Sequence, residues 1–158
     1  EAYDRGNGVV VLLYNRQKRS VVLTRQFRLP VFINGHHGFL IEAAAGLLDN
    51  ASPETRIVAE AEEETGYRVQ HIEKAMEAFM SPGSVTEKLY FFIAEYADDD
   101  RQSKGGGLAD EGEDIEVLEW PLTQALSAIR SGEIMDAKTI MLLQYVAMNV
   151  HFEEPKPC

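Results

Sequence analysis

The chain has 158 residues, with 15 Lys and Arg against 26 Asp and Glu, so its formal net charge is −11. This length and a hydrophobic content of 45% predict that residues 1–158 form a single domain with its own core. The acidic excess disfavours nucleic acids and anionic membrane surfaces as direct partners, because both are polyanions.

The first half of the chain predicts strands followed by one helix. Two β-branched runs, 9–14 and 20–26, flank a short polar turn and predict a pair of strands. Residues 33–38 predict a loop, and residues 39–44 a short strand. We expect a mostly strand-forming N-terminal half up to this point.

The helix that follows has clear start and stop signals. Ser52 is a suitable N-cap, and Pro53 fits the first helical position. We expect this helix to end at Thr65, because Gly66 supplies a C-terminal stop. Residues 69–79 mix strand and turn signals.

The second half alternates strands, a loop and helices. A buried strand is predicted over 88–96, a polar loop with three consecutive glycines over 98–112, and a half-buried strand over 115–120. Amphipathic patterns predict helices over 121–131 and 137–149. Together the elements predict an α+β fold.

The acidic residues are clustered. Nine of them lie in two short segments, 60–64 and 110–116, and without these nine the chain has 17 acids against 15 bases. A uniformly solubilised surface would distribute the charge more evenly. Clustered carboxylates can bind divalent cations, and these cations can recruit an anion.

The first cluster lies on the predicted helix. At ~100° per residue, Glu60, Glu63 and Glu64 share an arc of ~100°, and Glu62 lies on the opposite side. Like charges at this spacing cost ~0.2–0.5 kcal/mol per pair, and they also oppose the helix dipole near its C-terminal end. The pattern fits either a solvated acidic face or a bound cation, for which hard oxygen ligands favour Mg²⁺ or Mn²⁺.

The residues around this helix form a longer pattern, in which a glycine precedes the helix and a second glycine ends it. The pattern resembles the Nudix box, the loop–helix–loop signature of hydrolases that act on nucleoside diphosphates linked to another group. In this chain it reads Gly46 … Glu60-x-x-Glu63-Glu64-x-Gly66-Tyr67.

The front of the box departs from the usual pattern. It is one residue shorter than usual, Ser52 stands where a Glu is common, and Ala59 replaces the usual basic residue. Arg56, four residues before Glu60, is a candidate for the missing orienting charge.

The resemblance covers nearly the whole chain and points to the branch of GDP-mannose and ADP-ribose pyrophosphatases. The segments that carry it are Tyr3-Asp4-Arg5-Gly6-Asn7-Gly8, Arg25-Gln26-Phe27-Arg28, Ala45-Gly46-Leu47-Leu48-Asp49-Asn50, Ser81-Pro82-Gly83 and Asp110-Glu111-x-Glu113-Asp114-Ile115. It implies a Nudix fold, in which a mixed β-sheet is sandwiched between helices in an α/β/α arrangement.

The resemblance also implies an activity. The expected reaction is Mg²⁺-dependent hydrolysis of the pyrophosphate bond of a nucleoside diphosphate sugar, with Mn²⁺ as a possible substitute. GDP-mannose, giving GMP and mannose 1-phosphate, is the first choice, and ADP-ribose, giving AMP and ribose 5-phosphate, is the alternative. No residue pattern decides between guanine and adenine. A non-catalytic nucleotide-binding module with the Nudix fold remains a further alternative.

Metal ligands and catalytic residues follow from the same resemblance. The implied metal ligands are the carbonyl of Ala45 and the carboxylates of Glu60, Glu63 and Glu64, joined by Glu113. Glu63 is also implied in catalysis. The general base is expected from the glycine-rich loop, with Glu111 preferred and Glu113 as a metal-contacting or supporting group. A solvated acidic hinge is the alternative for this loop.

Four residues are candidates for substrate binding. Arg25 and Arg28 follow a strand and can pair with phosphate oxygens. Glu42 precedes the Ala45 turn and is a candidate contact to the base or ribose, and Glu87 matches a polar position near the site. A surface or purely structural role is the alternative for each.

The resemblance further implies a homodimer, in which an N-terminal segment exchanges between subunits. The chain opens with Glu1 rather than Met, so we expect part of that segment to precede it. Cys158 is the only cysteine and excludes an intrachain disulfide, which favours a reducing cytoplasm. No run of about 20 apolar residues predicts a membrane span.

Overall fold

The structure is a computed structural model that describes residues 1–108, 112 and 114–153. Within these residues, seven strands form one mixed sheet with the central order β3-β2-β1-β6-β5, to which β4 adds on β1 and β7 on β2. The strands are β1 (Gly8–Asn15), β2 (Ser20–Phe27), β3 (Phe39–Glu42), β4 (Ala44–Leu47), β5 (Ile72–Phe79), β6 (Lys88–Glu95) and β7 (Glu116–Pro121).

Strand β1 is the centre of the sheet. It pairs antiparallel with β2 and β4 and parallel with β6. All eight of its residues are buried, as is expected of a strand covered on both faces. Val10, Leu12 and Tyr14 contribute to one core, whereas the alternate residues Val9 and Val11 contribute to the other. The period of two in a strand therefore divides the interior into two layers.

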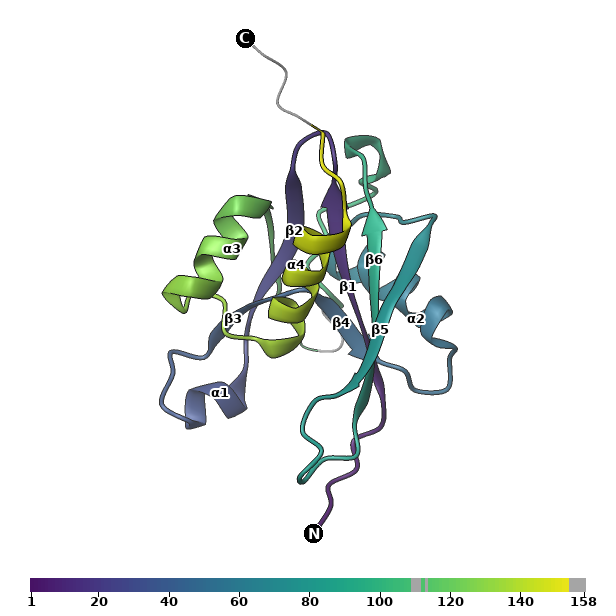
Figure 1. Cartoon of the computed structure of the whole chain (residues 1–158). Coiled ribbons are helices and arrows are strands. Elements are labelled where there is room, and N and C mark those ends of the chain that lie inside the picture. The colour runs from purple at the N-terminus through teal and green to yellow at the C-terminus, as the bar shows by residue number, and fades with distance from the viewer. Residues whose placement is uncertain (109–111, 113, 154–158) are drawn as a thin grey trace.

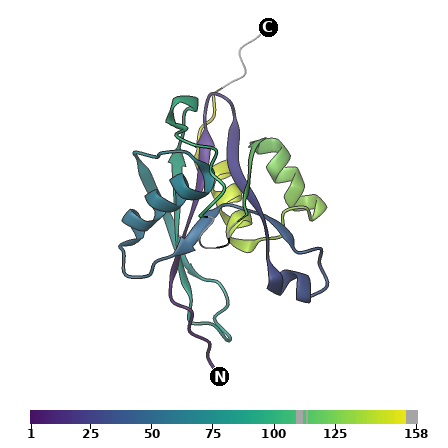
Figure 2. The ribbon, with the colours of Figure 1, turned by 180° about the vertical axis from the view of Figure 1, so that it is seen from behind.

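Helices cover both faces of the sheet, as Figures 1 and 2 show from opposite sides. Helices α3 (Leu122–Ser131) and α4 (Ala137–Asn149) pack on one face, and α2 (Pro53–Glu60) packs on the other. The predicted α+β class, with a mixed sheet between helices, is confirmed.

The strand predicted over 39–44 is in fact two strands with different partners. β3 pairs with the end of β2, whereas β4 pairs with the start of β1. The change of partner occurs at Ala43, whose backbone N–H donates to Thr139 Oγ1 at 2.8 Å. A hydrophobic run cannot reveal this switch, because both strands are equally apolar.

A short helix, α1 (Leu29–Ile33), lies where we predicted no regular structure. Pro30 stands at its beginning, a position that tolerates proline, so the proline initiates a helical turn here. Residues 69–79, in which strand and turn signals are mixed, form strand β5 only from Ile72 onward.

The start and end of the predicted helix over 53–65 are confirmed. Ser52 caps α2 by accepting the backbone N–H of Thr55, and Gly66 ends the following turn in the left-handed conformation. The last turn, η1 (Ala61–Thr65), is π-helical rather than α-helical. Such widened turns occur frequently at functional sites.

Within the described residues, no helix is long and apolar enough to span a membrane.

Candidate functional site

A polar cleft of about 740 Å³ lies between the helix formed by α2 and η1, which we call the glutamate helix, the end of β2 and the start of α4. Charged side chains of both signs face it. Those that line it are Arg5, Arg28, Glu42, Asp49, Arg56, Glu60, Glu87 and Lys138, together with the backbone of Ala45 and Gly46. Of the residues predicted for the site, it therefore gathers Arg28, Glu42, Ala45, Glu60 and Glu87.

Two glutamates of the helix are buried beside β4. Only 4% of Glu60 and 2% of Glu64 is exposed. Glu64 Oε2 accepts the backbone N–H of Ala45 at 3.1 Å. A Cβ at Gly46 would lie 1.8 Å from Glu60 Oε1, so only glycine allows the strand to approach this carboxylate so closely.

Arg56 supplies the orienting charge that Ala59 cannot. Its guanidinium forms an ion pair with Glu60, lies 3.9 Å from a Glu63 oxygen, and donates to the Leu47 carbonyl at 3.1 Å. One arginine thus links the two carboxylates to β4.

Glu62 has a different environment on the same helix. It is partly exposed and accepts two hydrogen bonds from Arg68, both at 3.0 Å. The predicted separation of Glu62 from the other three glutamates is reproduced. Glu62 is bound by its own ion pair away from the cleft.

The donor set around the end of this helix fits a hard divalent cation, although only Glu60 and Ala45 of this set line the cleft. Glu60, Glu63 and Glu64 offer carboxylate oxygens, and Ala45 offers a carbonyl, which are the ligand types that Mg²⁺ and Mn²⁺ prefer. Burial of two carboxylates at one place is costly unless cations compensate it. Among the described residues, no three acidic, His or Cys side chains converge on one point.

The cleft also holds a second charged cluster around Glu42, which is 2% exposed. Arg28 donates to both carboxylate oxygens, at 2.8 and 3.3 Å, and Lys138 Nζ lies 2.6 Å from Oε1. Burial opposes ionisation of Glu42, but Lys138 and Arg28 outweigh it and hold the pKa of its carboxyl below the ordinary value. Burial likewise opposes the charge of Lys138, yet Glu42 and Asp136 raise the pKa of its ammonium.

The other substrate candidates lie in different settings. Glu87 lines the cleft and pairs with Arg5 at 3.4 Å. Arg25, in contrast, does not line the cleft and pairs with Glu116 of β7 at 2.5 Å, with both side chains about half exposed. Glu111 and Glu113 lie outside the described residues, so the expectations for them stay predictions.

Sequence reasoning missed Lys138 and Arg5. We predicted only an amphipathic helix over residues 137–149, and the only local signal for Lys138 was its place at the start of that helix, beside Asp136. Arg5 belongs to a segment that carried the family resemblance but was given no role of its own.

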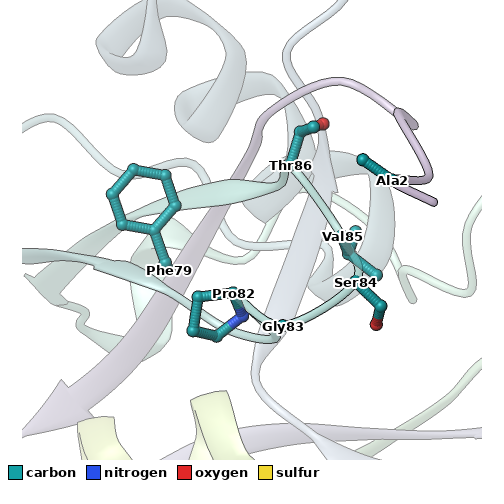
Figure 3. A pocket seen from close by; sticks show the side chains of 7 residues that line it. All are labelled: Ala2, Phe79, Pro82, Gly83, Ser84, Val85 and Thr86. Atoms are coloured by element: carbon teal, nitrogen blue, oxygen red, sulfur yellow. The ribbon is translucent and has the colours of Figure 1, made fainter.

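A second cavity, of about 400 Å³, is lined by Ala2 of the N-terminal segment and by Phe79 and residues 82–86 of the β5–β6 connection (Figure 3). None of the predicted site residues lines it. Tyr3 joins the two segments, because its N–H donates to Ser84 and its carbonyl accepts from Thr86.

Comparison with known proteins agrees with this geometry. The family model described as NUDIX domain matches residues 4–143. A GDP-mannose pyrophosphatase of Citrobacter koseri is 59% identical over 147 residues, which cover 92% of this chain and 76% of that protein. Proteins of the same name from Shigella flexneri and Klebsiella pneumoniae are 57% and 58% identical, over 94% and 92% of this chain and 78% and 73% of their own lengths.

Nudix hydrolases generally depend on a divalent metal, as the oxygen donors in this cleft would require. The box, the sheet between helices and the extent of these matches agree, and the chain belongs to the Nudix family of hydrolases.

Proposed function

We propose that the protein hydrolyses GDP-mannose to GMP and mannose 1-phosphate, with Mg²⁺ as the divalent ion and Mn²⁺ as a substitute. The observation that carries this proposal is a single cleft in which the buried carboxylate of Glu60 lies together with the cations Arg28 and Lys138. The identity of 57–59% to proteins named GDP-mannose pyrophosphatase supports the choice of substrate.

Two positively charged side chains, an arginine and a lysine, would hold the phosphates of the substrate. Arg28 and Lys138 are both anchored on Glu42, which keeps their charged groups at the wall of the cleft. Their remaining N–H donors can bind phosphate oxygens, and a guanidinium suits this geometry. Glu87, held by Arg5, is a further polar side chain in the cleft that can contact the substrate.

Glu60, Glu63, Glu64 and the Ala45 carbonyl would hold the metal. A bound divalent ion would polarise the phosphoryl oxygens and lower the pKa of a water molecule. In the reaction, one P–O bond of the pyrophosphate bridge breaks and one forms to the oxygen of water. We propose Glu111 as the base that takes the water proton, with Glu113 as a supporting or metal-contacting group.

The test is a panel of nucleotide sugars incubated with Mg²⁺, with release of the nucleoside monophosphate as the measured product. We expect GDP-mannose to be cleaved with the highest kcat/KM. If ADP-ribose is cleaved preferentially, GDP-mannose is the wrong substrate, but the proposed hydrolysis of a pyrophosphate bond stands. If the protein binds the metal but cleaves no member of the panel, the proposal of an enzyme is wrong, and the alternative of a non-catalytic nucleotide-binding module stands.

We also propose a homodimer through the N-terminal segment. Tyr3 and Phe79 are exposed large hydrophobic residues beside the second cavity, and a partner subunit would cover them. Light scattering coupled to gel filtration measures the mass directly, and a monomer at micromolar concentration would reject this assembly. A reducing, cytoplasmic setting fits the single cysteine, Cys158.

A further inference from the structure

The glycine-rich segment crosses the C-terminal end of the glutamate helix. We call residues 103–107 the glycine strap. The N–H of Gly106 donates to the carbonyl of Glu64 at 2.9 Å, and the N–H of Gly107 donates to the carbonyl of Glu63 at 3.1 Å. The last carbonyls of a helix lack partners within the helix, so the strap satisfies two of them.

The strap and the helix end approach so closely that side chains are excluded from both. A Cβ at Gly105 would lie 2.5 Å from the carbonyl oxygen of Glu64, and a Cβ at Gly66 would lie 2.4 Å from the carbonyl oxygen of Ser103. The obstacles are backbone atoms, which cannot rotate away. Gly105 also has a φ of +69°, which favours glycine.

Glu64 is therefore held at two points. Its backbone carbonyl is bound by the strap, and its carboxylate accepts the N–H of Ala45 in β4. These contacts fall on the π-helical turn itself, so its widened backbone is supported from outside the helix. Displacement of the strap would move the backbone of Glu63 and Glu64 together.

On the basis of the proposed function, we propose that the glycine strap is a positioning element that sets the divalent-metal affinity of the helix carboxylates. The strap touches neither metal nor substrate in this role, and acts through the backbone of Glu63 and Glu64. Groups that orient metal ligands typically contribute about 10–100-fold to metal affinity.

The variant Gly105→Ala tests this proposal. Gly132→Ala is the matched control, because Gly132 also has a positive φ, of +82°, but a Cβ there meets nothing within 4 Å. Binding of Mn²⁺ alone, followed by electron paramagnetic resonance of the free ion, measures affinity without catalysis. We expect Gly105→Ala to bind Mn²⁺ about tenfold or more weakly, and Gly132→Ala to remain within about twofold of the parent protein.

Activity supplies a second readout. The Mg²⁺ concentration for half-maximal hydrolysis should rise with the loss of Mn²⁺ affinity, while kcat at saturating metal should change less. A folded Gly105→Ala protein that binds Mn²⁺ with unchanged affinity would overturn the proposal.

A milder variant keeps the test decisive if Gly105→Ala does not fold. Gly106→Ala strains the strap through its φ of +114°, but its Cβ would lie 3.6 Å from the nearest atom, the Ile115 carbonyl oxygen. We expect about threefold weaker Mn²⁺ binding, and unchanged binding would reject the strap's role. A parent protein that binds Mn²⁺ but cleaves no nucleotide sugar would reject only the proposed function.

Discussion

Two clusters in this molecule have the same chemistry and different surroundings. In each, a carboxylate is held by a lysine and further donors: Glu42 by Lys138 and Arg28, and Glu119 by Lys18 and the hydroxyl of Tyr96. Both carboxyl groups have a lowered pKa, because their cations outweigh burial. Only the Glu42 cluster lines the cleft.

The Glu119 cluster joins separate parts of the chain to one another. Tyr96 Oη lies 2.7 Å from both Ser20 Oγ and Glu119 Oε1, and Lys18 also pairs with Asp98 at 2.8 Å. Burial raises the pKa of the Tyr96 hydroxyl, so it remains a neutral donor. The Glu119 cluster thus joins parts of the fold, whereas the donors of the Glu42 cluster also face an open cleft.

The largest effect is expected at the carboxylates that we propose as metal ligands. We expect Glu64→Gln to lower kcat by about 100-fold or more, which corresponds to about 2.7 kcal/mol or more, because an amide is a poorer metal ligand than a carboxylate. Glu62→Gln is the control on the same helix and should remain near the parent rate. Steady-state kinetics with Mg²⁺ measure both, and equal rates for the two variants would remove Glu64 from the metal site.

The second effect concerns stability and pH. Glu42→Gln leaves two cations without their buried counterion, and we expect a loss of about 2–3 kcal/mol in the free energy of unfolding at pH 7, since Arg28 is partly solvated. Glu119→Gln should cost less, because its side chain is 32% exposed. Urea unfolding measures both free energies. A larger loss of stability for Glu119→Gln than for Glu42→Gln would contradict this prediction.

The pH dependence has a definite sign. The folded-state pKa of Glu42 lies below the ordinary value of 4.5. Its contribution to stability is therefore fully present above pH 4.5 and is lost as the pH falls through the folded-state pKa. Glu42→Gln should show a shallower loss of stability in that acidic window than the parent protein.

The third effect is on KM, and it distinguishes Lys138 of the Glu42 cluster from Lys18 of the Glu119 cluster. Lys138→Met should raise KM for the nucleotide sugar about tenfold, because a charged hydrogen bond to phosphate contributes about 1.5 kcal/mol or more. Lys18→Met should leave KM within about twofold and act only on stability. A change in KM for Lys18→Met alone would place the binding surface at the other end of the sheet.

The smallest effect is expected at Arg25. Its half-exposed pair with Glu116 predicts a stability change within about 0.5 kcal/mol for Arg25→Ala, and KM should stay within about twofold. A tenfold rise in KM would instead support the phosphate contact that sequence reasoning expected of this residue.

The local features of the site could be predicted from the amino-acid sequence alone. Ser52 and Gly66 marked the ends of the glutamate helix, and the spacing of its acids separated Glu62 from Glu60 and Glu64. These features follow from helix periodicity and capping, which depend only on neighbouring residues. The resemblance to the Nudix box rests on the same short-range pattern.

The charge pairs of the cleft and the contacts of the strap depend on the tertiary structure. Lys138 joins Glu42 from 96 residues away, and Arg5, near the start of the chain, pairs with Glu87 near its middle. The strap glycines meet the carbonyls of Glu63 and Glu64 across some 40 residues. Such contacts depend on how the strands pair and how the helices pack against the sheet, and no local spacing in the sequence encodes them.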